Sequence, residues 1–150
     1  MFSGKTKMLI NKIKEAISKN NKVSVFKPKI DVRYNAEKIV SHEKNEISAI
    51  PVNNSKDIVD LAKKSSFVAI DEAQFFDLDI VNTCIQLAKN NTQVILAGLD
   101  MDYLGKPFGP MPKLMAIADE ITTLHAKCDI CNEKACHTYR ASKNNDTIML

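Results

Sequence analysis

Two short segments of this chain carry residue types that could hold a nucleoside triphosphate. Gly4-Lys5-Thr6, preceded by Ser3, stands at the start of a predicted helix and matches the second half of G-x-x-x-x-G-K-[ST]. In that loop, backbone N–H groups and the lysine bind phosphate oxygens, while the threonine hydroxyl ligates Mg²⁺. The tripeptide by itself could also be a chance sequence at a helix start, so a second feature is needed.

The second segment is an apolar strand that ends in two acids, Val68-Ala-Ile-Asp-Glu72. Such a strand places its first carboxylate beside the Mg²⁺ of a phosphate-binding loop. The next acid faces another direction and could accept a proton from a nucleophile. A solvated acid pair at the end of a strand is the alternative for this segment alone. Together with Gly4-Lys5-Thr6, however, the segment predicts binding of a triphosphate with Mg²⁺.

Composition restricts the class of protein. The chain has 150 residues, 45% of them hydrophobic and 26% charged, which is typical of one globular domain. Its net charge of +3 is too small to indicate binding to nucleic acid or to a membrane surface. No apolar run approaches the ~20 residues of a membrane span, and no secretory signal precedes the first helix. The four cysteines therefore predict reduced thiols or metal ligands in a cytoplasmic protein.

Hydrophobic spacing predicts alternating helices and strands. Helices are expected at 6–20, 55–63 (with Ser55 as N-cap), 79–89 and 113–119, and strands at 23–26, 67–70 and 94–97. The stretch 30–51 is predicted as a long loop with one short strand at 46–50, and 120–124 as extended. This order predicts an α/β fold with a parallel sheet flanked by helices. Ligands of such sheets bind beyond the carboxyl ends of the strands, here 28–33, 71–76 and 99–108.

Further motifs follow one another in a fixed order: Met1-Phe-Ser-Gly-Lys-Thr6, Asp31-Val-Arg-Tyr34, Ser41-His42, Ile70-Asp-Glu-Ala-Gln-Phe-Phe76, Gly98-Leu-Asp-Met-Asp-Tyr103, Lys106-Pro-Phe-Gly109 and Cys128-Asp-Ile-Cys131. As a set they resemble the type II thymidine kinases, over essentially the whole chain. The resemblance implies a P-loop NTPase-type α/β domain at 1–124. It also implies the start of a small zinc-binding lasso domain at 125–150.

The resemblance implies transfer of the γ-phosphate of ATP to the 5′-hydroxyl of thymidine or deoxyuridine. Glu72 then matches the general base, and Asp71 a Mg²⁺ ligand, directly or through water. Lys5 and Thr6, with Ser3 and Gly4, match the loop that holds the triphosphate and the metal.

Three further residues match the phosphate-binding region of the family. Asp31 and Arg33 form its D-x-R motif, and Gln74 falls in its nucleotide-binding segment. Arg33, one of only two arginines, could stabilise the transferring charge. An ordinary loop salt bridge with Asp31 is the alternative for Arg33.

The nucleoside pocket of the family is apolar, and five residues match positions that line it: Met1, Phe75, Leu99, Tyr103 and Phe108. Tyr103 is expected to stack against the base or sugar. Without the resemblance, Phe75, Phe76 and Phe108 would be interpreted as core residues.

Cys128 and Cys131 have the spacing of two thiolates that share one zinc ion. The family supplies two more ligands from a later pair, for which this chain offers only Cys136 and His137. Adjacent residues rarely point at one metal ion, so half a zinc site with two free thiols is the favoured alternative. The first P-loop glycine and the strand before it are likewise not in the sequence. We therefore expect an incomplete kinase with weak or no activity alone, and a homotetramer for the full-length protein. Another P-loop nucleoside kinase or ATPase, or an inactive zinc-ribbon remnant, are the alternatives.

Overall fold

A computed structural model describes residues 3–30, 38–40, 46–128 and 130–135. Its centre is a parallel sheet in the order β4-β1-β5-β6. The strands are β1 (Val23–Pro28), β4 (Ile50–Val52), β5 (Phe67–Ile70) and β6 (Gln93–Leu96). Phe26 pairs with Ile70, and Ile70 with Leu96, so β5 and β6 end at one level, while β1 runs two residues further to Pro28. The predicted α/β class with a parallel sheet is therefore confirmed.

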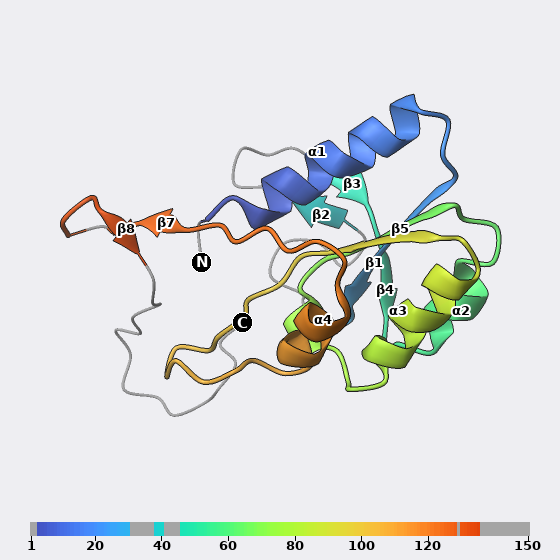
Figure 1. The fold of residues 1–150 in the computed structure, drawn as a ribbon. Coiled ribbons are helices and arrows are strands. Elements are labelled where there is room, and N and C mark those ends of the chain that lie inside the picture. The colour runs from blue at the N-terminus through green and yellow to red at the C-terminus, as the bar shows by residue number, and fades with distance from the viewer. Residues whose placement is uncertain (1–2, 31–37, 41–45, 129, 136–150) are drawn as a thin grey trace.

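Helices cover both faces of the sheet (Figure 1). On one face lies α1 (Lys5–Ser18), and on the other lie α2 (Asp57–Leu61), α3 (Ile80–Lys89) and α4 (Met111–Ile117). Two buried clusters result, because successive strand residues point to opposite faces. Val25 and Ala69 pack with α1, while Phe26 and Ile70 pack with the helices on the other face.

The buried face of α1 consists of Leu9, Ile10, Ile13 and Ala16, spaced three or four residues apart. Met8 and Ile17, also apolar, are 38% and 54% exposed. The apolar side of α1 predicted from the sequence is therefore wider than the part of the helix that packs on the sheet.

The single strand predicted at 46–50, within the long loop between 30 and 51, is wrong. Residues 46–50 were expected as one strand, but β3 (Glu46–Ser48) and β4 belong to different sheets. β3 pairs antiparallel with β2 (Lys38–Val40), whereas β4 joins β1 in parallel. Short edge strands form through pairing partners distant in sequence, so a local pattern does not reveal them.

Two other local predictions differ from the structure. Ser55 does not cap the second helix, because its hydroxyl donates a hydrogen bond to Asp77 Oδ1 at 2.6 Å. The segment 120–124 contains neither helix nor strand. It leads into a hairpin of β7 (Ala126–Lys127) and β8 (Lys134–Ala135), which projects away from the central sheet (Figure 1).

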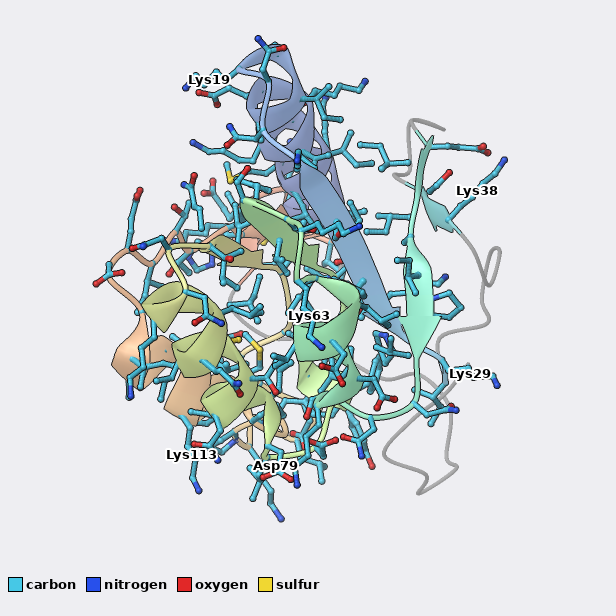
Figure 2. The ribbon with its side chains drawn as sticks, turned by 90° about the vertical axis from the view of Figure 1, so that its right-hand side faces the viewer. Lys19, Lys29, Lys38, Lys63, Asp79 and Lys113 are labelled. Atoms are coloured by element: carbon cyan, nitrogen blue, oxygen red, sulfur yellow. The ribbon has the colours of Figure 1, made fainter. Side chains whose placement is uncertain are left out.

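Exposed lysines come from several different elements of the fold. The labelled lysines 19, 29, 38, 63 and 113 lie at separate places around the outside of the molecule (Figure 2). None of the described helices is both long and apolar enough to cross a membrane.

Candidate nucleotide-binding and catalytic site

The N-terminal end of α1 meets the carboxyl end of β5. The Lys5 ammonium lies 2.5 Å from Glu72 Oε1 and 3.7 Å from Asp71 Oδ1. The Thr6 hydroxyl donates to Asp71 Oδ2 at 3.5 Å. Gly4 begins this turn with φ +82°, a left-handed conformation that glycine adopts without strain. The two segments singled out in the sequence are therefore in direct contact.

Strand alternation explains why Asp71 points toward α1. Ala69 packs in the α1 cluster, and Asp71, two residues later, lies on the same face. Its backbone N–H donates to the Phe26 carbonyl at 3.0 Å, which continues the pairing with β1. The residue is only 5% exposed, so its charge needs compensating partners. Lys5 and Thr6 are such partners.

Glu72 leaves the strand in a strained conformation. Its φ of +51° and ψ of +43° are left-handed, which is uncommon for a residue other than glycine. Such strain collects at functional sites, where it aims a side chain that a regular strand would direct elsewhere. The Glu72 N–H is satisfied by Asp71 Oδ1 at 2.9 Å. The Glu72 carboxylate consequently reaches Lys5 on one side and Gln74 on the other.

Gln74 lies in the single turn η1 (Ala73–Phe75) that follows Glu72, and it is 2% exposed. Its Nε2 donates to Glu72 Oε2 at 2.5 Å, and its Oε1 accepts the Leu99 N–H at 3.0 Å. The sequence placed Gln74 among the phosphate-binding residues; the structure places its amide between Glu72 and the segment that follows β6.

An aromatic pair joins this turn to the same segment. The rings of Phe75 and Phe108 meet edge to face, with centroids 5.5 Å apart and an interplanar angle of 88°. Both are partly exposed, whereas Phe76 belongs to the buried core. The interpretation as a core residue therefore holds for Phe76 but not for Phe75 or Phe108. Leu99 and Tyr103 lie on the same 99–108 segment, which Met101 and Pro107 bridge.

The cysteine pair lies on the hairpin of β7 and β8. The Cys128 N–H donates to the Glu133 carbonyl at 2.7 Å, and the Asn132 N–H donates to the Cys128 carbonyl at 2.8 Å. Cys128 is partly buried and Cys131 is exposed. A structural zinc ion needs four ligands, and in the described part of the chain no three His, Cys, Asp or Glu residues gather around one point. Cys136 and His137 lie outside the described residues. Two thiols alone do not complete a zinc site.

With this geometry established, comparison with known proteins identifies the family. A family model described as Thymidine kinase matches residues 1–150. The chain belongs to the thymidine kinase family. It is 47% identical over 150 residues to a Thymidine kinase of Bacteroides fragilis, covering all of this chain and 75% of that protein. Thymidine kinases of Porphyromonas gingivalis and Rhodothermus sp. are 45% and 43% identical over the whole chain, which spans 74% and 70% of their lengths.

The side-chain oxygens of Thr6 and Asp71 have the chemistry that a magnesium ion needs. Mg²⁺ prefers hard oxygen donors and usually takes one or two carboxylates, with phosphate oxygens and water completing its shell. Thr6 and Asp71 offer a hydroxyl and a carboxylate within hydrogen-bonding distance of each other. The residues present therefore fit a magnesium ion that arrives with its nucleotide.

Three predicted site residues, Met1, Asp31 and Arg33, lie outside the described residues.

Lys27 was not identified from the sequence as a buried, positively charged residue near the site. Lys27, at the carboxyl end of β1, is 3% exposed and donates to the Lys38 carbonyl at 3.1 Å. By strand alternation it lies on the face of Val25 and α1, toward the edge of the sheet where Asp71 stands. The sequence did contain a signal for this residue, because Lys27 directly follows the predicted apolar strand at 23–26.

Proposed function

We propose that this protein phosphorylates thymidine, transferring the γ-phosphate of Mg-ATP to the 5′-hydroxyl. The observation that carries the proposal is the contact between Lys5, from the start of α1, and the two acids at the end of β5. This arrangement provides a cation for phosphate oxygens, a carboxylate for Mg²⁺ and a second carboxylate for the proton. Family membership supports thymidine as the nucleoside.

Each of these residues has a distinct task in the transfer. Lys5 and Thr6 would hold the triphosphate, and Thr6 and Asp71 would hold Mg²⁺, which would supply positive charge beside the phosphate oxygens. Glu72 accepts the proton of the 5′-hydroxyl while that oxygen bonds to the γ-phosphorus and ADP leaves. When a triphosphate binds, Lys5 exchanges Glu72 Oε1 for phosphate oxygens, which frees that carboxylate oxygen for the proton. Ser3 and Gly4 contribute to the same loop.

The nucleoside is proposed to bind beside the aromatic pair. Phe75 and Phe108 provide an apolar edge next to Glu72, and Leu99 and Tyr103 extend it along the 99–108 segment. Tyr103 is proposed to stack on the base or sugar, and Met1 to complete the pocket. Asp31 and Arg33 are proposed to act at the phosphate side. Deoxyuridine is the expected second substrate.

The remaining proposals concern assembly. We propose a P-loop domain at 1–124 and a zinc-binding element beginning at 125, in which Cys128 and Cys131 give two ligands. Zinc content measured in wild-type protein and in Cys131→Ser tests this, since equal zinc in both would reject the site. We also propose that the full-length protein is a homotetramer and works in the cytoplasm, and light scattering of the purified protein measures its mass.

The decisive experiment measures ADP formation from Mg-ATP with and without thymidine. Glu72→Gln should lower turnover about 10²- to 10⁴-fold, the usual contribution of a positioned base. The matched control is Glu120→Gln, because Glu120 is exposed and lies outside the site. ATP hydrolysis that ignores thymidine would favour the ATPase alternative. Equal turnover in Glu72→Gln and wild type would reject Glu72 as the base.

A further inference from the structure

Gln74 is the most enclosed polar side chain of the site, and both ends of its amide are occupied. Its Nε2 donates to Glu72 Oε2 at 2.5 Å, and its Oε1 accepts the Leu99 N–H at 3.0 Å. The orientation of the amide follows from its partners, since a carboxylate can only accept a hydrogen bond and a backbone N–H can only donate one. At 2% exposure Gln74 has little surface for a nucleotide.

The surrounding chain closes tightly around this residue. A Cβ on Gly109 would lie 2.2 Å from the Gln74 carbonyl oxygen, and one on Gly98 would lie 3.0 Å from its Oε1. Gly109 therefore approaches the backbone of Gln74, and Gly98 lies close to the end of its side chain. Close packing around a side chain that is 2% exposed restricts the rotamers it can adopt. The amide is thus a fixed link between Glu72 and the 99–108 segment.

We propose that Gln74 is a positioning residue. It fixes the carboxylate of Glu72 and couples the position of that carboxylate to Leu99, in the segment that carries the proposed nucleoside contacts. The inference rests on the proposed role of Glu72 as the base. It differs from phosphate binding by Gln74, the role suggested by the family motif, because the amide is already engaged on both sides.

The coupling can be measured without turnover. Hydrogen exchange at the Leu99 amide should become at least about tenfold faster in Gln74→Met, which keeps the length of the side chain but cannot accept this bond. Exchange at Leu99 should also become faster in Glu72→Ala, because Gln74 then loses the partner that orients it. Gln86→Met and Glu120→Ala, at exposed positions, should leave that rate unchanged. Melting temperatures of all four variants exclude general unfolding as the cause.

Steady-state kinetics then separates positioning from binding. In Gln74→Met, kcat should fall about 10- to 100-fold because the base is held less closely, while the Kd for Mg-ATP stays within about threefold of wild type. Gln74→Glu removes the donor to Glu72 and sets a second carboxylate beside it. It should therefore lose kcat and, like Glu72→Ala, show faster exchange at Leu99.

Two results would overturn the inference. One is exchange at Leu99 that is unchanged in both Gln74→Met and Glu72→Ala. The other is a Kd for Mg-ATP that rises tenfold or more in Gln74→Met, which would make Gln74 a nucleotide ligand. A wild-type protein that binds Mg-ATP but does not phosphorylate thymidine would reject the proposed function; the exchange rates would still decide whether Gln74 couples Glu72 to Leu99.

Discussion

Gly109→Ala is expected to be among the most damaging single-methyl substitutions in this protein. Gly109 has a φ of +52°, and an alanine there pays about 1–2 kcal/mol for the left-handed conformation. The added Cβ would lie 2.2 Å from the Gln74 carbonyl oxygen. That oxygen belongs to the backbone, so no side-chain rotation relieves the clash. Forcing the two segments apart adds about 1–3 kcal/mol, the usual range for overpacking.

Gly105→Ala is the matched control for this substitution. Gly105 also has a positive φ, +72°, but a Cβ there would meet nothing within 4 Å. Its cost should be the conformational part alone, about 1–2 kcal/mol. Since 1 kcal/mol shifts the melting temperature by about 2–4 °C in a chain of this size, Gly109→Ala should melt at least about 2 °C below Gly105→Ala.

Thermal unfolding of the two variants, followed by circular dichroism, measures this difference. Gly109→Ala should also lower thymidine phosphorylation about tenfold, because Gln74 and with it Glu72 are displaced; Gly105→Ala should not. Equal melting temperatures for the two variants would refute the argument from close approach.

Three further substitutions or treatments have defined outcomes. Burial raises the pKa of Asp77, but hydrogen bonds from the Ser55 hydroxyl and backbone N–H groups outweigh it and leave that pKa lowered. A carboxyl group whose pKa is lowered on folding stabilises the fold above its unfolded pKa of about 3.9, and this stability is lost as pH falls through the folded pKa. Urea unfolding should therefore show Asp77→Asn to be less stable than wild type at pH 7, with the difference in unfolding free energy closing below pH ~4. A difference that stays constant down to pH 2.5 would contradict this. Burial raises the pKa of the Cys84 thiol to about 12, so a maleimide at pH 8 should label the exposed Cys131 in the folded protein and Cys84 only after unfolding; equal labelling rates would show that Cys84 is accessible. Lys5→Met should raise the Kd for Mg-ATP at least about tenfold in equilibrium dialysis, since it removes the charge that faces the phosphates, and an unchanged Kd would separate Lys5 from the triphosphate.

The sequence predicted the central elements of the fold well because their signals are local. The fully apolar run Phe67–Ile70 is buried, as expected of a parallel strand. The helix predicted at 79–89 is α3, which begins one residue later, at Ile80. The failures have one physical cause. β4 and the pairing of β2 with β3 depend on distant partners, and the Ser55 hydroxyl bonds Asp77, 22 residues away, instead of the nearby helix.

By itself the sequence determined which residues could do chemistry: Lys5, Thr6, Asp71 and Glu72 were chosen by type and by their places beside a helix start and a strand end. Only the tertiary structure decided how they meet. The register of β1, β5 and β6 brings Phe26, Ile70 and Leu96 level, and the packing of α1 on one face of the sheet sets Lys5 against both acids. The same is true of Gln74, whose amide links Glu72 to Leu99. A hydrogen bond between residues far apart in sequence exists only once the chain is packed, because it is packing, not local pattern, that fixes their distance and orientation.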